Sequence, residues 1–335
     1  MKEKPNWPAR RLTRRSLIFE GAKVVLGLTI AGILGSCVED EKDEITKTWL
    51  DLEKRFSYKP VDFETFKSVV VPLTARTYVA HSGTSLAEAE IINSIKFNQI
   101  SRPNVLEGQI LSLDVTDPRN AHRIRPPLFG LFDFKQGIID LDFNTYPQPV
   151  KRKWGSHYEF VSHLTLLRSG LLHEFVHFDT KLKSPSAIKN LVDFPPEETL
   201  DTGFRVIWYD PKTTYLDDGR LGTFDEEITD LLACRISNKA DLDYSTFRER
   251  GRNLKKLFST INLDFAKLLN MHRQSDIVSF VNFLAEKSEG VFSQDKKLEF
   301  GLRIVEQILK NNWYGIEELF PGFQQQKDGI FICRP

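Results

Sequence analysis

The strongest signal for the fold is residues 158–178, which read YEFVSHLTLLRSGLLHEFVHF. Its apolar residues recur at steps of three and four, which is the period of an amphipathic helix packed on a core. The recurring positions are Phe160, Leu164, Leu167, Leu171 and Phe175. We expect a helix from Tyr158 onward, with Gly170 as its weakest point because glycine lowers helix stability.

The chain before this helix predicts a mixture of helix and strand. Ile45, Trp49, Leu52 and Phe56 recur at helical spacing. The segments 68–79 and 107–115 are rich in β-branched and apolar residues and predict strands, the first interrupted at Pro72. Residues 137–143 alternate and predict a further strand that ends at the proline-rich segment 146–149.

The chain after the helix is mainly helical in pattern. A short strand is expected at 203–209, followed by helical runs at 247–261, 277–285 and 302–309. We therefore predict an α+β fold with a mixed N-terminal lobe, residues 45–180, and a mainly helical C-terminal lobe, residues 181–335.

The composition excludes several classes of protein. Hydrophobic residues make up 41% of 335 residues, and 46 Lys and Arg balance 46 Asp and Glu. These values exclude a disordered chain and a polytopic membrane protein. Residues 1–37 carry seven Lys and Arg against two Asp and Glu, so the rest of the chain is mildly acidic. Nucleic acid is therefore not an expected partner.

The first 37 residues have the pattern of an export signal. A basic stretch ends at Arg14-Arg15, and the apolar run 24–36 that follows is too short to span about 30 Å of hydrocarbon as a helix. The residues before Cys37, Leu34-Gly35-Ser36, resemble a bacterial lipobox, which implies a lipid on the Cys37 thiol. The paired arginines also resemble a twin-arginine signal, and the general secretory route remains the alternative.

An acidic run, residues 38–44, follows Cys37. It predicts a solvated tether, and it also resembles the signal that sends some lipoproteins to the outer face of the outer membrane. The remaining cysteines are Cys234 and Cys333. They fit either a disulfide in an oxidising compartment or two buried thiols.

The main chemical signal is His173-Glu174-Phe175-Val176-His177. Residues i and i+4 of a helix lie on one face, so the two imidazoles can converge on one Zn²⁺ ion. Glu174 lies about 100° around the helix, where it can reach a water bound to that metal. Two unrelated surface histidines are the alternative, but the apolar surroundings make an unpaired carboxylate costly there.

This HExxH helix resembles that of the zincin metallopeptidases. The metzincin branch is excluded because Thr180 and Lys183 occupy its glycine and third-histidine positions. The gluzincin branch takes a glutamate from a second helix, followed four residues later by an aspartate that orients the first histidine. Glu226 and Asp230 match that pattern. The resemblance therefore implies a zincin-like fold in which Glu226 is the third zinc ligand and Asp230 orients His173.

The acidic run at 225–227 also has a simpler explanation. Three consecutive acids at a helix N-terminus interact favourably with the helix dipole, and Asp225 in particular is expected to be such a cap, on a helix that begins near Thr223.

The resemblance implies zinc-dependent hydrolysis of a peptide or protein substrate, with Glu174 as the general base. Residues 137–143 are expected to form the cleft edge strand on which a peptide docks. The candidates for stabilising the oxyanion are His157, His163, Tyr209 and Tyr215. Two alternatives remain open: zinc-dependent hydrolysis of a non-peptide amide, and a surface binding lipoprotein with a structural zinc site.

Overall fold

A computed structural model of the chain describes residues 30–98, 130–133, 137–143, 150–154, 157–182, 199–208, 216–217, 219–245, 251–325 and 332–333. Residue contacts divide the chain into two compact units, Met1–Glu44 and Ile45–Pro335. The fold of the second unit is described below. It is mostly helical with small β-sheets, which confirms an α+β fold.

The first helix, α1 (Ile30–Phe56), begins before Cys37 and runs through the acidic segment 38–44, which was expected to be a tether. Its predicted apolar face is confirmed, because Ile45, Trp49, Leu52 and Phe56 are all buried. Among the described residues, no helix is long and apolar enough to cross a membrane.

The strand predicted at 68–79 is wrong, because this segment is helical. It comprises α2 (Phe63–Thr65), the π-helical turn η2 (Phe66–Val70) and α3 (Val71–Ser82). Asp62 caps the N-terminus by accepting a hydrogen bond from the backbone N–H of Thr65. Pro72 is the second residue of α3 and directly follows the π-helical turn η2, so its missing N–H falls where the regular α-helical hydrogen bonding is already interrupted. Burial at helical spacing therefore outweighs the β-branched composition.

Helix α4 (Glu88–Asn93) leads into a three-stranded sheet with the order β1-β3-β2. Strand β1 (Ile95–Asn98) pairs parallel to β3 (Ile138–Asp142), and β2 (Gly130–Asp133) pairs antiparallel to β3 on its other side. The strand predicted at 137–143 is thus confirmed, but it is central and cannot be the edge on which a peptide docks. The strand predicted at 107–115 lies outside the described residues.

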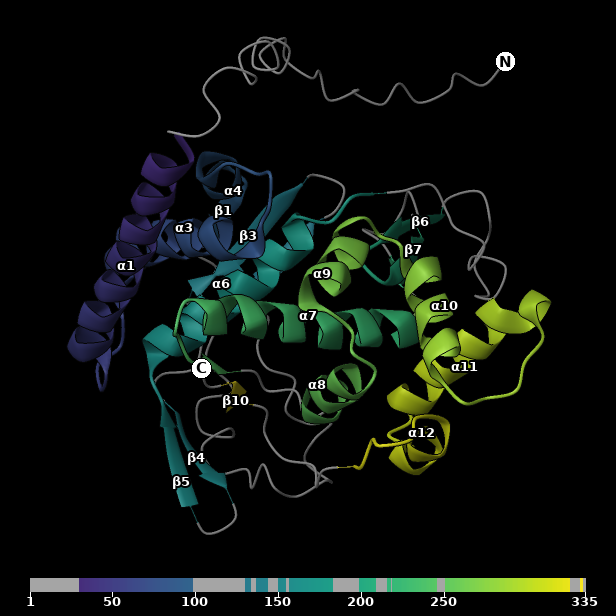
Figure 1. The fold of residues 1–335 in the computed structure, drawn as a ribbon. Helices are drawn as coiled ribbons and strands as arrows, with labels where there is room; N and C mark the ends of the chain where they lie inside the picture. Colours follow the sequence, from purple (N-terminus) through teal and green to yellow (C-terminus); the bar gives the residue numbers. More distant parts are fainter. Residues whose placement is uncertain are drawn as a thin grey trace, which may run out of the picture. The chain divides into compact units, whose positions relative to one another are not determined.

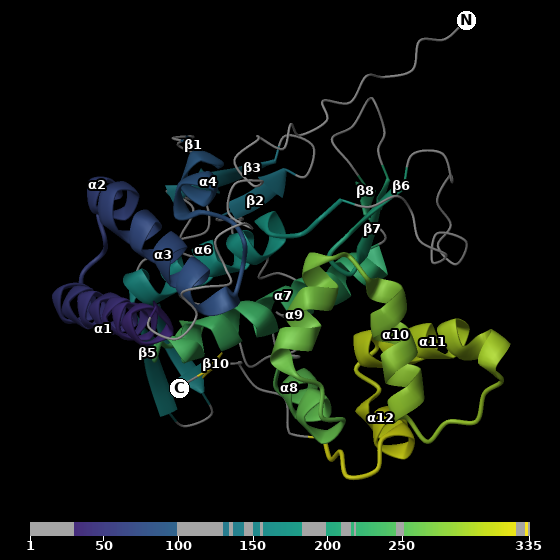
Figure 2. The same cartoon turned by 45° about the horizontal axis from the view of Figure 1, so that its top comes forward.

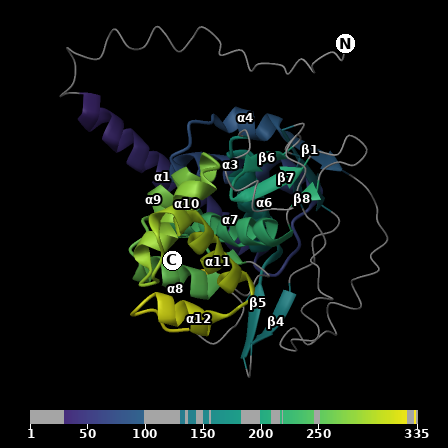
Figure 3. The ribbon, with the colours of Figure 1, turned by 90° about the vertical axis from the view of Figure 1, so that its right-hand side faces the viewer.

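The long helix predicted from Tyr158 onward begins later than predicted. Residues 157–161 form β5, which pairs with β4 (Val150–Trp154) in a hairpin that projects away from the helices in Figures 1 and 3. Helix α6 (His163–Phe178) then runs without interruption through Gly170. Its start is set by Ser162, whose Oγ accepts a hydrogen bond from the backbone N–H of Thr165 at 3.1 Å.

A small antiparallel sheet separates α6 from the next long helix. Its order is β6 (Thr199–Thr202), β7 (Arg205–Trp208) and β8 (Leu216–Asp217). Strand β7 confirms the short strand predicted at 203–209. Helix α7 (Gly219–Lys239) follows and is buried along most of its length.

The rest of the chain is mainly helical, as predicted. The helices here are α8 (Gly251–Thr260), α9 (Phe265–Arg273), α10 (Ile277–Lys287), the 3₁₀ turn η5 (Gln294–Lys296), α11 (Lys297–Leu309) and α12 (Trp313–Leu319). Strand β9 (Tyr244–Ser245) pairs antiparallel with β10 (Ile332–Cys333).

Helices α6 and α7 pack against each other at the centre of this unit. Figures 1 and 2 show α8 to α12 gathered on one side of this pair, with α3 and α4 on the other. A single hydrophobic core includes buried residues of both central helices, such as Leu171 and Phe175 on α6 and Ile228 and Leu232 on α7. Side chains of α6 and α7 that face each other are therefore held in a rigid, largely dry setting.

Candidate metal centre

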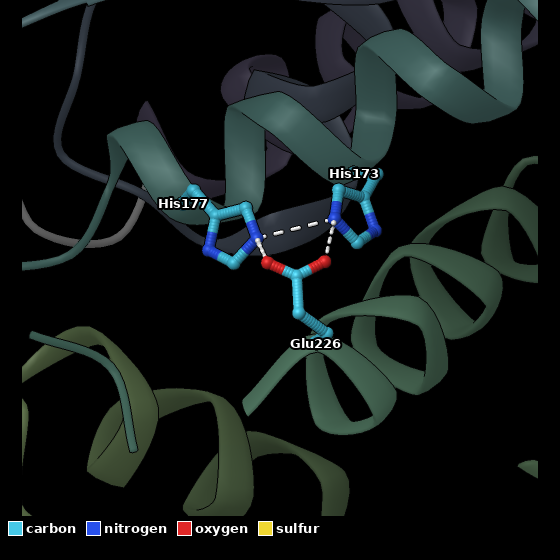
Figure 4. Close-up of side chains that lie close together, drawn as sticks. All are labelled: His173, His177 and Glu226. Atoms are coloured by element: carbon cyan, nitrogen blue, oxygen red, sulfur yellow. Dashed lines mark hydrogen bonds and ion pairs between the residues drawn. The ribbon is translucent and has the colours of Figure 1, made fainter. Parts of the chain in front are cut away.

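The structure brings His173, His177 and Glu226 together between α6 and α7 (Figure 4). The Nε2 atoms of the two histidines lie 3.1 Å apart. Oε2 of Glu226 lies 3.1 Å from Nε2 of His173, and Oε1 lies 3.2 Å from Nε2 of His177. Among the described residues, these three form the one group of His, Cys, Asp and Glu side chains that fits a metal ion.

The donor set fits zinc in both chemistry and spacing. Zn²⁺ prefers imidazole nitrogen and carboxylate oxygen at about 2.0–2.2 Å, and tetrahedral ligands at that distance lie about 3.3–3.5 Å from one another. The observed separations of 3.1–3.2 Å are only a few tenths of an ångström shorter. The three side chains therefore need little movement to share one ion.

The outer ring nitrogens of both histidines face carboxylates of α7. Nδ1 of His173 donates to Oδ1 of Asp230 at 2.8 Å, because an ionised carboxylate only accepts. Nδ1 of His177 lies 3.7 Å from Oδ2 of Asp225. Carboxylates in this position fix the ring orientation and leave Nε2 to bind a metal. Asp230 is itself held by Tyr244, whose hydroxyl donates to Oδ1 at 2.7 Å.

The pKa values of the three candidate ligands are shifted by burial and by the charges of neighbouring side chains. Burial opposes protonation of His173, but the carboxylates of Asp230 and Glu226 outweigh it and raise its pKa to about 10. Burial lowers the pKa of His177 to about 4, and Arg205 and His173 add to this effect. Arg205 holds the pKa of Glu226 well below its ordinary value despite burial. The carboxylates that favour a positive charge on His173 would also favour a metal cation bound beside it.

Comparison with known proteins finds no matching family model, no significant match among curated proteins and none among solved structures. The site must therefore be interpreted from its own geometry.

The expectation that Asp225 is only a helix cap is wrong. Helix α7 begins at Gly219, so the acids at 225–227 lie inside the helix rather than at its start. Asp225 is 1% exposed and accepts from the backbone N–H of Phe204 at 2.5 Å, from Nε of Arg205 at 2.7 Å and from Nε2 of His272 at 2.9 Å. These bonds join β7 and α9 to α7 beside the histidines.

The close approach at Asp225 depends on Gly203, in the turn between β6 and β7. Gly203 has φ +57°, a left-handed conformation that favours glycine. A Cβ atom at this position would lie 2.3 Å from Oδ1 of Asp225 and 2.9 Å from Nε2 of His272. Glycine is thus required for both backbone conformation and space.

The C-terminal end of α6 is fixed by a second buried carboxylate. Asp179 accepts from the Tyr78 hydroxyl at 2.9 Å and from Nε of Arg273 at 2.6 Å. Because His177 lies in the last turn of α6, these bonds restrict its position along the helix axis.

Glu174 lies on α6 between the two histidines and is 8% exposed. The candidates for stabilising an oxyanion fare differently. His163 is buried at the start of α6, about 15 Å along the helix axis from His173, and its Nδ1 accepts from the backbone N–H of Val61 at 3.0 Å. Tyr209, Tyr215 and the side chain of His157 lie outside the described part of the chain.

Sequence reasoning missed Arg205, which contacts both Asp225 and Glu226. One signal was available, because Arg205 is the sole charge in the otherwise apolar stretch 204–208. A buried charge of this kind requires a partner.

Cys234, on α7, is disulfide-bonded, which decides against a free thiol at that position.

Proposed function

We propose that this protein is a zinc-dependent hydrolase of peptide bonds, of gluzincin type. The main observation behind the proposal is that the metal-binding group has three members, and that within the described ranges no fourth His, Cys, Asp or Glu belongs to it. Catalytic zinc sites use three protein ligands and keep one position for water, whereas structural sites use four. The side chains of Glu226 and His173 are 25% and 12% exposed, so solvent reaches this side of the group.

Bound zinc would act as a Lewis acid and lower the pKa of water toward about 7. The residues of the chain then have separate tasks. Glu174 accepts the proton of the attacking water and passes it to the leaving amine. Asp230 holds His173 in the tautomer that presents Nε2, and Asp225 lies on the corresponding side of His177. The same arrangement would serve hydrolysis of a non-peptide amide, so the substrate class rests on the resemblance to zincins.

The second candidate is a surface binding lipoprotein that lacks the structural zinc site considered from the sequence, and in which these residues form a buried ion network without metal. One observation favours it: Glu226 and Asp225 already pair with Arg205 at 2.5 and 2.6 Å. Such a network satisfies its charges in the absence of any ion. Metal content separates the two candidates.

The test uses the mature protein, purified and analysed for metal by mass spectrometry, with cleavage of a peptide library as the activity assay. We expect about one zinc per chain and cleavage that a chelator abolishes. Glu174→Gln should retain zinc and lose about two to four orders of magnitude in rate, because an amide cannot accept the proton. A protein without metal, or a Glu174→Gln variant with undiminished cleavage, would exclude this mechanism.

We further propose that the protein is exported and anchored by a lipid on Cys37. The support is the sequence pattern alone, namely the basic stretch, the short apolar run and the small residues before Cys37. The acidic segment 38–44 is consistent with display at the outer face of the outer membrane. Export by this route would place the proposed hydrolase among extracellular peptides and proteins.

A further inference from the structure

Arg205 lies unusually close to a candidate metal ligand for a cationic side chain. Its Nη2 donates to Oε1 of Glu226 at 2.5 Å and lies 3.5 Å from Nε2 of His177. A guanidinium repels a metal cation, so its presence here requires a reason.

The position of Arg205 is set by Asp225 rather than by Glu226. Nε and Nη2 of Arg205 both bind Oδ2 of Asp225, at 2.7 and 2.6 Å. Asp225 is held in turn by the backbone N–H of Phe204 and by His272. Arg205 is 4% exposed, so water does not compete for these bonds. The guanidinium is therefore fixed before any metal binds.

We propose that Arg205 is a positioning residue that holds Oε1 of Glu226 and leaves Oε2 as the single oxygen this side chain gives to the metal. This inference rests on the proposed zinc site. A glutamate that gave both oxygens would supply four donor atoms together with the two histidines, so a bound water would become a fifth ligand. By engaging one oxygen, Arg205 keeps the site at three protein ligands with one position open.

The test replaces zinc by Co²⁺, whose visible absorption is intense in four-coordinate sites and weak in five-coordinate ones. The variants are Arg205→Gln, which lacks the charged fork, and Arg205→Lys, which retains a donor for Oε1. The matched control is Arg168→Gln, because Arg168 is also a buried arginine, and its partners are Glu53 and the backbone carbonyl of Asp243, neither of which belongs to the group of three ligands. Circular dichroism checks the fold of each variant.

We expect the intense four-coordinate spectrum for the wild-type protein and for Arg168→Gln. Arg205→Gln should lose most of this intensity, because Glu226 is then released to bind through both oxygens, and Arg205→Lys should restore it. A merely structural role for Arg205 predicts no change in a folded variant. An unchanged spectrum in folded Arg205→Gln would overturn the inference and leave the zinc site intact.

A second measurement on the wild-type protein covers the case in which Arg205→Gln does not fold. X-ray absorption at the zinc edge counts the ligands and detects a carboxylate bound through two oxygens. Four ligands with a singly bound carboxylate are expected, and a doubly bound carboxylate would overturn the inference. If wild-type protein bound neither zinc nor Co²⁺, the proposed function and this inference would both fail.

Discussion

Replacing Asp230 by Ala removes one acceptor that serves two donors. Oδ1 of Asp230 binds Nδ1 of His173 at 2.8 Å and the hydroxyl of Tyr244 at 2.7 Å. After the replacement, His173 loses the carboxylate that fixes its ring orientation and that keeps its Nε2 atom directed at Glu226. We therefore expect weaker zinc binding although no ligand is lost.

The expected size of this effect follows from the geometry. The side chains of His173 and Asp230 are only 12% and 7% exposed, so solvent does not screen the bond. A hydrogen bond to a charged group in such a place is worth about 1.5–3 kcal/mol. Loss of an orienting carboxylate typically costs about 10–100-fold in metal affinity, which is about 1.4–2.7 kcal/mol. The two estimates agree, so Asp230→Ala should weaken zinc binding by about 10–100-fold.

The assay is zinc affinity by competition with a chromophoric chelator, with thermal unfolding as an independent check of the fold. Glu226→Ala is the positive control and should remove most bound zinc, because only two ligands remain. Glu227→Gln is the matched negative control, since Glu227 lies about 100° from Glu226 around the helix and does not belong to the group of three ligands. Glutamine keeps the shape of this buried side chain.

Two results would refute the reasoning. Folded Asp230→Ala with wild-type zinc affinity would show that the bond to His173 does not orient the ring. Loss of zinc in Glu227→Gln with zinc retained in Glu226→Ala would show that α7 presents a different register to α6.

Three further predictions concern stability and location. Gly203→Ala should lower the free energy of unfolding by about 2–4 kcal/mol, because backbone strain and steric overlap act together. Gly83→Ala is the control: Gly83 has φ +67° and open space around it, so only the strain of about 1–2 kcal/mol is expected. Equal losses in the two variants would show that the close approach at Gly203 is not a cause. In metal-free protein the raised pKa of His173, about 10, gives stability that is full below pH 6.5 and lost as pH rises toward 10, while the lowered pKa of His177, about 4, gives stability that is lost as pH falls from 6.5 toward 4. The free energy of unfolding, measured across pH, should therefore be highest near pH 6.5. A free energy of unfolding that rises steadily to pH 10 would contradict the assignment. Cys37→Ser should release the protein from the detergent phase on partitioning, and unchanged partitioning would argue against the lipid anchor.

The parts of this protein that were predicted correctly depend on local pattern. The core helix at 163–178 follows from apolar spacing that its own residues carry. The proximity of Glu226 to the two histidines was not given by local pattern; it was expected from the resemblance to gluzincins, and the structure brings the three side chains together. The strand predicted at 68–79 failed because β-branched residues also fit a buried helix once neighbouring elements cover it.

What was missed depends on contacts between distant segments. The role of Asp225 comes from donors in β7 and α9, and no spacing within 225–230 reveals them. The start of α7 at Gly219 was missed for a related reason, because burial in the core extends this helix beyond the acidic turn that resembled an N-terminus. Arg205 could be recognised as an anomaly in an apolar stretch, but its partners could not be named.

The bonds around Asp225 also indicate how relatives of this protein can be recognised. Asp225 needs an arginine on one side and a glycine that lets the turn approach it, so the segment 203–205 should change together with Asp225 and not independently of it. A search for homologues should therefore require three blocks in order: HExxH, then Gly-Phe-Arg, then the acidic block 225–230. The lengths of chain between the blocks can differ, because connecting segments tolerate insertions far better than paired buried charges tolerate the loss of one partner.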